Sequence, residues 1–99
     1  MRTIETLIRE QSGTLVDVRT PAEFMGGHAA HSINIPLQEL HHRVTELAQL
    51  PQPIMVCCAS GTRSAQAARF LQQQNLKCVN AGSWLNVNYI QSLIRLSLR

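Results

Sequence analysis

Aromatic side chains are scarce in this chain, and it contains no long hydrophobic run. Aromatics make up 4% of the 99 residues, and no basic run carries aromatics between its members, as nucleic-acid-binding surfaces often do. No apolar stretch approaches the roughly 20 residues that span a bilayer. We therefore expect neither a nucleic-acid partner nor a membrane partner. Residues 1–5 lack the apolar core of a secretory signal, which favours a cytoplasmic protein, or a periplasmic one if a leader has been removed.

Acidic side chains are missing from the second half of the chain. All six aspartates and glutamates lie within residues 1–46, where they outnumber four arginines. Residues 47–99 carry five lysines and arginines and no acid. A pocket built from this half would attract a small anion, although an imbalance of this size in a short chain also arises by chance.

Cysteines number only three: Cys57, Cys58 and Cys78. An odd count with two adjacent members argues against a disulfide framework. No cysteine and histidine have the spacing of a zinc site, so we expect no bound metal. Free thiols point to a reducing compartment or to a catalytic thiol.

The order of the expected elements indicates one α/β domain over residues 1–99. Apolar β-prone runs predict strands at 14–18, 33–35, 54–58 and 77–80. Helical spacing and capping residues predict helices at 3–11, 20–25, 37–49, 63–74 and 89–98. Strands separated by helices favour a small parallel sheet of about four to five strands, with helices on both faces.

The junction between the strand at 54–58 and the next helix is the strongest candidate site. Ligands of open α/β sheets bind at the carboxyl ends of strands, and this strand ends at Cys58. Small residues follow, so the backbone is able to curl and point several N–H groups into one concavity. These groups, the helix dipole and the cation of Arg63 all favour a thiolate at Cys58. The candidate substrate-binding residues are Ala59, Ser60, Gly61, Thr62 and Arg63.

The cysteines of this chain have two other interpretations, one purely structural and one as a different kind of catalytic loop. A cysteine at the end of a buried strand is often a small hydrophobe, and we interpret Cys78 in that way. Alternatively, Cys57 and Arg63 have the Cys-x5-Arg spacing of phosphatase and arsenate reductase loops, whereas Cys58 gives a loop one residue shorter. The shorter loop suits a sulfur atom better than a tetrahedral oxyanion. Spacing alone does not decide whether Cys57 or Cys58 is the nucleophile. Strand side chains alternate, so only one of the two cysteines faces the pocket.

The wider pattern resembles the rhodanese family. Four segments match family motifs in order along the chain: Leu15-Val16-Asp17-Val18-Arg19 through Glu23-Phe24, Gly27-His28 with Ile33-Asn34-Ile35-Pro36, Cys58-Ala59-Ser60-Gly61-Thr62-Arg63-Ser64, and Val79-Asn80-Ala81-Gly82-Ser83-Trp84. The chain departs from the family at His31-Ser32, where Gly-Ala is usual. It also has only Met1-Arg2 before the first helix, where the family usually has a short strand.

The resemblance implies a single-domain thiosulfate sulfurtransferase with its nucleophile at Cys58. In that chemistry the thiolate takes a sulfur from a small anionic donor, thiosulfate or a polysulfide, and forms a persulfide. The sulfur then passes to cyanide or to a thiol, including that of a thioredoxin-like protein. No cofactor is required. A non-catalytic persulfide carrier needs the same loop, so that alternative stays open.

Three further residues are assigned supporting roles. Ser64 closes the loop motif. Asp17 either supports the loop, near its backbone or Arg63, or simply caps the next turn. Arg19 is either a structural ion-pair partner, for which Glu23 is one candidate, or a substrate contact.

Overall fold

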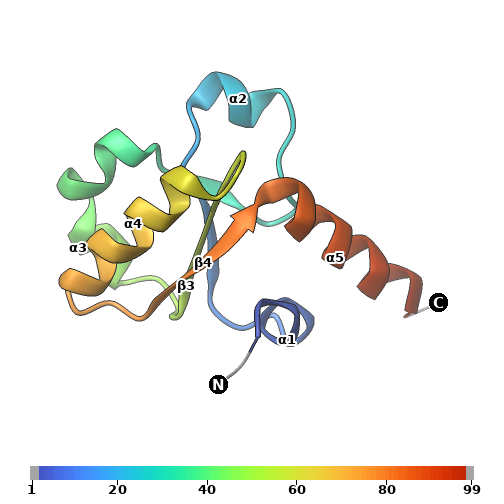
Figure 1. Cartoon of the computed structure of the whole chain (residues 1–99). Coiled ribbons are helices and arrows are strands. Elements are labelled where there is room, and N and C mark those ends of the chain that lie inside the picture. The colour runs from blue at the N-terminus through green and yellow to red at the C-terminus, as the bar shows by residue number, and fades with distance from the viewer. Residues whose placement is uncertain (1–2, 98–99) are drawn as a thin grey trace.

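Four parallel strands in the order β2-β1-β3-β4 form the centre of the computed structural model, which describes residues 3–97 (Figure 1). The strands are β1 (Thr14–Asp17), β2 (Ile33–Asn34), β3 (Ile54–Cys58) and β4 (Cys78–Ser83). The helices are α1 (Ile4–Arg9), α2 (Pro21–Met25), the 3-10 helix η1 (Leu37–His42), α3 (Val44–Ala48), α4 (Thr62–Gln73) and α5 (Trp84–Ser97). The predicted parallel α/β sheet is confirmed, with four strands in the described part.

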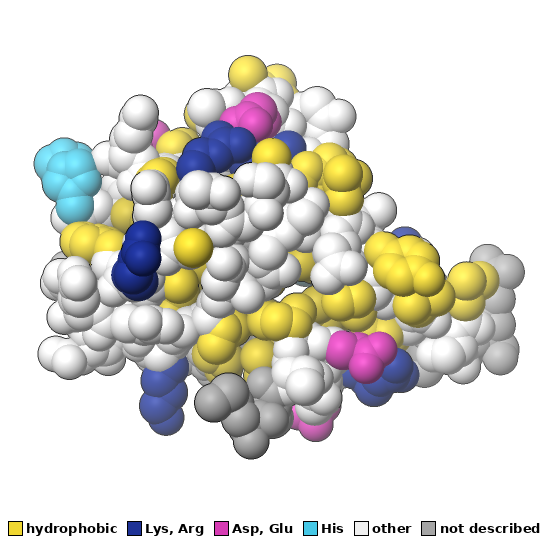
Figure 2. Space-filling model, in the orientation of Figure 1, with side chains coloured by type: hydrophobic (Ala, Val, Ile, Leu, Met, Phe, Trp, Pro, Cys, Tyr) yellow, Lys and Arg dark blue, Asp and Glu magenta, His cyan; other side chains and the backbone are white. Residues whose placement is uncertain are grey.

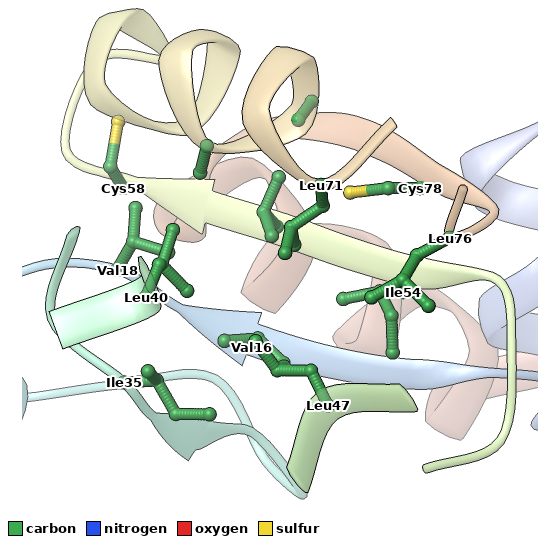
Figure 3. Close-up of a cluster of buried hydrophobic side chains, with 13 residues drawn as sticks. Val16, Val18, Ile35, Leu40, Leu47, Ile54, Cys58, Leu71, Leu76 and Cys78 are labelled. Carbon is green, nitrogen blue, oxygen red and sulfur yellow. The ribbon is translucent and has the colours of Figure 1, made fainter. Parts of the chain in front are cut away.

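Helices cover both faces of the sheet, as predicted, and β3 shows why. Its five residues are all buried and alternate between two apolar clusters. Ile54, Val56 and Cys58 face η1, α3 and α4, where Leu40, Leu47 and Leu71 complete the larger cluster (Figure 3). Met55 and Cys57 face α1 and α5. A strand buried on both sides in this way reads as a continuous apolar run.

Helix α2 begins where its sequence predicts. The Thr20 hydroxyl accepts from the backbone N–H of Glu23, while the Glu23 carboxylate accepts from the backbone N–H of Thr20. This reciprocal capping box, with Pro21 in the first turn, fixes the short helix above the carboxyl ends of the strands.

The predicted single helix over 37–49 is wrong. Its first half is wound as η1, in which side chains three positions apart eclipse, so that Leu37 and Leu40 point the same way. Arg43 then leaves the helical conformation, with φ −123° and ψ 21°, before α3 starts. The Arg43 guanidinium pairs with Glu39 on one side of this break and with Glu46 on the other.

The last strand and the last helix also differ from expectation. β4 continues to Ser83 instead of ending at residue 80, and α5 starts directly afterwards at Trp84 instead of residue 89. The Ser83 hydroxyl accepts from the backbone N–H of Leu85 and so supports this early start. Leu98, the predicted helix end, and the possible strand at Met1-Arg2 lie outside the described residues. Within residues 3–97, no helix combines the length and the apolarity needed to cross a membrane.

Candidate active site

The loop after β3 lies at the carboxyl end of the sheet, as the sequence predicts. β3 ends at Cys58 and α4 begins at Thr62, with Gly61 between them at φ +101°. This left-handed conformation is one that L side chains rarely adopt. A Cβ on Gly61 would make only an ordinary van der Waals contact with the Cα of Gly82 in β4, at 3.5 Å, so the backbone conformation is what favours glycine. Glycine at this position therefore lets the loop turn back over the end of β3.

This turn gathers hydrogen-bond donors around one sulfur atom. The Cys58 Sγ accepts from the backbone N–H of Gly61 at 3.0 Å and from that of Ser64 at 3.4 Å. The Ser64 hydroxyl oxygen lies 3.4 Å from the same sulfur. Cys58 itself is fully buried, beneath the loop that encloses it. The arrangement provides positive partial charge at a single point, which suits a thiolate or another small sulfur anion.

The pKa of Cys58 reflects two opposed influences. Burial raises it, because the charged form loses water. Hydrogen bonds from the side chain and backbone of Ser64 and from the backbone of Gly61 and Ser60 lower it, and together they outweigh the burial. The pKa of the Cys58 thiol therefore lies below its ordinary value.

The pKa values of the other two thiols are raised instead of lowered, and this difference can be tested by alkylation. Burial raises the pKa of both Cys57 and Cys78 to about 12. From about pH 6 to about pH 9, iodoacetamide should label Cys58 and leave the other two cysteines unmodified. The Cys58 rate should reach half its maximum at a lower pH than in the urea-unfolded chain, as followed by peptide mass spectrometry. Equal midpoints in the folded and unfolded chains would contradict the lowered pKa.

Arg63 is at the loop, as predicted, but it is already paired. Its guanidinium donates to both carboxylate oxygens of Glu23, at 2.7 and 3.0 Å. Figure 2 shows basic and acidic side chains in contact where α2 meets the start of α4. The hydrogen bond from Arg63, and then that from the Thr20 backbone, lowers the pKa of Glu23 to about 2. The sequence analysis placed Glu23 in a helix cap and named it as a candidate partner of Arg19, but it missed the contact with Arg63, although Glu23 lies within a family motif.

Asp17 and Arg19 form a buried ion pair with each other. Asp17 alternates onto the other face of the sheet and lies opposite Cys57, so its charge reaches Arg63 only at a distance, where it helps to raise the Arg63 pKa. Of the two expected roles, the cap of the next turn is seen directly, since the Asp17 carboxylate accepts from the backbone N–H of Arg19 at 3.0 Å. The same carboxylate accepts from Arg19 Nε at 3.0 Å and from Nη2 at 2.8 Å. The two side chains are 0% and 5% exposed.

Arg19 also joins several segments near the site, so the structure gives it the structural role among the two expected. It donates to the carbonyl oxygens of Gly27 at 2.6 Å and of Glu23 at 3.3 Å. Its guanidinium carbon lies 4.6 Å from the centre of the Trp84 ring, a cation–π distance. The predicted partner, the Glu23 carboxylate, is instead bound to Arg63.

The remaining loop residues face solvent. Ala59, Ser60 and Thr62 are exposed, and the Ser60 hydroxyl donates to the Thr62 hydroxyl at 3.4 Å instead of to the sulfur. The sequence analysis missed Asn80 of β4, whose side chain contacts both Ser64 and Gly61. Asn80 could have been found from the sequence, because it is a polar residue in an otherwise apolar strand and lies within a family motif.

Cys57 has surroundings that oppose a thiolate. It is fully buried among the residues that face α1 and α5, on the opposite side of β3 from Cys58. After burial, the nearby negative charge of Asp17 is the next cause that raises its pKa. Both cysteines are free thiols.

Comparison with known families gives one match over most of the chain. A model of the rhodanese-like domain matches residues 2–89, nearly the whole chain. The chain therefore belongs to the rhodanese-like domain family.

Named relatives cover a range of descriptions. An uncharacterized protein of Bacillus subtilis, YqhL, is 36% identical over 78 residues, which cover 73% of this chain and 61% of that protein. The thiosulfate sulfurtransferase GlpE of Pseudomonas syringae is 35% identical over 72 residues, covering 73% of this chain and 67% of GlpE. A putative sulfur carrier protein of Bacillus subtilis, YrkF, is 36% identical over 70 residues, covering 71% and 37%. The match thus spans about three fifths of YqhL and little more than a third of YrkF.

A solved structure has the same fold over nearly its full length. The rhodanese-related protein of Thermoplasma volcanium superposes with a TM-score of 0.74 at 34% sequence identity. The superposition covers 92% of this chain and 93% of that one. The family assignment thus agrees with the parallel α/β sheet.

Proposed function

We propose that this protein is a sulfurtransferase that carries sulfur as a persulfide on Cys58. The observation that supports this most directly is the position of the Cys58 sulfur, which accepts from the backbone N–H groups of Gly61 and Ser64. These donors stabilise a thiolate before reaction and a negatively charged persulfide after it. The proposed thiolate chemistry calls for neither a metal nor a cofactor.

The proposed reaction has two steps. The Cys58 thiolate attacks the outer sulfur of thiosulfate, a new S–S bond forms, the S–S bond of thiosulfate breaks, and sulfite leaves with the electron pair of that bond. Cyanide or a thiolate then attacks the outer sulfur of the persulfide and takes it, and the Cys58 thiolate is restored. Each step forms one bond to sulfur and breaks one, with total charge and electron count conserved, so no external oxidant or reductant is needed.

Direct loading of sulfur tests the proposal. Incubation with thiosulfate should increase the mass of the intact protein by one sulfur atom, and subsequent cyanide should remove it and yield thiocyanate. Polysulfide serves as a second donor in the same assay. A protein that gains no sulfur from either donor, while its Cys58 stays reduced and alkylatable, would overturn the proposal.

A sulfur carrier is the second candidate, favoured by the similarity to a putative sulfur carrier protein. It requires the same loading of Cys58 but slow release to cyanide. Loading within the assay time combined with negligible thiocyanate would favour the carrier, and repeated turnover would favour the enzyme. A phosphatase that uses Cys57 is disfavoured because that thiol faces the side of β3 opposite the loop and its pKa is raised to about 12.

A further inference from the structure

Asn80 connects three parts of the site through one carboxamide. It lies in β4 beside an irregularity in the pairing of β3 and β4, where the register shifts after Val56. Its Oδ1 accepts from the backbone N–H of Gly82 at 2.8 Å, and its Nδ2 donates to the carbonyl of Gly61 at 3.2 Å. A backbone N–H only donates and a carbonyl only accepts, so these two partners fix which amide atom is oxygen and which is nitrogen.

This orientation determines where the hydroxyl proton of Ser64 lies. The Ser64 Oγ is 2.6 Å from Asn80 Oδ1, and since that oxygen is an acceptor, Ser64 must donate to it. Ser64 has a single hydroxyl proton. Its contact with the Cys58 sulfur, at 3.4 Å, therefore presents an oxygen lone pair to the sulfur. A thiol suits that lone pair because S–H is able to donate to it, whereas a thiolate requires the hydroxyl to turn and donate to the sulfur.

We propose that Asn80 is a positioning residue that competes with the Cys58 sulfur for the hydroxyl proton of Ser64. In the thiol state the chain of donors runs from Cys58 to Ser64 to Asn80. In the anionic state Ser64 donates to the sulfur, and Asn80 Oδ1 keeps only the backbone N–H of Gly82. This deepens the function proposed above, since it rests on Cys58 being the thiol that bears sulfur. Asn80 thereby favours the neutral thiol, and Ser64 favours the anion.

The effect of Asn80 on Cys58 does not pass through the charged groups around the loop. On the α2 and α4 side, Glu23 and Arg63 are paired with each other. Across β3, Cys57 and the Asp17–Arg19 pair belong to the other face of the sheet. The acidic and imidazole groups of η1, namely Glu39, His41 and His42, are exposed. Substituting Asn80 or Ser64 removes none of these groups.

The rate of alkylation of Cys58 tests the proposal, and it requires no sulfur donor. At a pH well below the thiol pKa, Asn80→Ala should raise the iodoacetamide rate about three- to tenfold, the size expected when one hydrogen bond is transferred to the thiolate. Ser64→Ala should lower it by a similar factor. The Asn80→Ala substitution should have no further effect in the Ser64→Ala background, because its influence passes through Ser64.

A purely structural role for Asn80 predicts the opposite sign. If the Nδ2 bond to Gly61 merely holds the loop, its loss moves the Gly61 N–H away from the sulfur and slows alkylation in both backgrounds. A slower Asn80→Ala protein, or an equal effect with and without the Ser64 hydroxyl, would therefore overturn the proposal. Asn80→Asp provides a second variant: it keeps an acceptor for Ser64 and adds a negative charge, so it should slow alkylation. Because no persulfide is involved, these outcomes are independent of whether thiosulfate loads the protein.

Discussion

Replacing Cys58 with serine should reduce the transfer of sulfur from thiosulfate to cyanide by at least about three orders of magnitude, the scale seen when a covalent nucleophile is removed. Serine keeps the size of the side chain but its hydroxyl is not ionised near neutral pH, so it neither attacks thiosulfate nor holds a persulfide. Thiocyanate formation under excess thiosulfate and cyanide measures the effect. The serine variant should remain folded, because it exchanges one small side chain for another.

Cys57→Ser is the matched control, since the two residues are adjacent in β3 and equally buried. Its side chain points to the other face, so thiocyanate formation should stay within a few-fold of the unmodified protein. Loss of activity in Cys57→Ser with retention in Cys58→Ser would contradict the proposed nucleophile. It would favour the longer Cys-x5-Arg loop instead.

Replacing Asp17 with alanine should lower the free energy of unfolding by about 3–5 kcal/mol, since a buried cation then loses its partner. The Arg19 side chain is 5% exposed, and its hydrogen bonds to the Gly27 and Glu23 carbonyls hold it in this buried position. Urea unfolding followed by circular dichroism measures the change. Small domains have total stabilities of about 5–15 kcal/mol, so this loss is a large part of the whole.

Glu46→Ala provides the comparison for an exposed pair. Glu46 pairs with Arg43 at 2.7 Å, but their side chains are 51% and 34% exposed. We expect its removal to cost less than about 1 kcal/mol, since water screens such pairs. If the Asp17→Ala and Glu46→Ala variants lose similar free energy of unfolding, the buried Asp17–Arg19 pair does not stabilise the fold more than an exposed pair does. Asp17→Asn, which keeps an acceptor for Arg19, should fall between the two.

Local sequence signals predicted the parts of the fold that depend on nearest neighbours. The capping box at Thr20 and Glu23 and the buried run at 54–58 are encoded within a few residues, and both are where the sequence places them. The helix expected over 37–49 failed, because apolar residues at spacings of three and four fit both an α-helix and a 3-10 turn. The late start expected for α5 failed because Ser83, as a cap, was not recognised.

The residues of the site likewise fall into those that are close in sequence, which the sequence predicted, and those that come from distant segments, which it did not. The cysteine, the small loop and the helix start are contiguous, so the sequence identified the cradle around Cys58. The partners of that cradle come from distant segments: Glu23 lies forty positions before Arg63, and Asn80 lies sixteen positions after Ser64. Strand alternation could have placed Asp17 on the face opposite the loop, since Val16 and Val18 share the cluster of Cys58.

The strand order has a consequence for when the reactive thiol comes into existence. The central pair, β1 and β3, joins Thr14 to Ile54, and β2 and the three helices α2, η1 and α3 lie between them in the sequence. Such long-range parallel pairing forms late and slowly during folding, because a large loop must close first. In the unfolded chain Cys58 is an ordinary thiol with no oriented N–H groups nearby. Its reactivity is therefore a property of the completed tertiary structure, so a chain that is still folding has little thiolate to lose to stray oxidants.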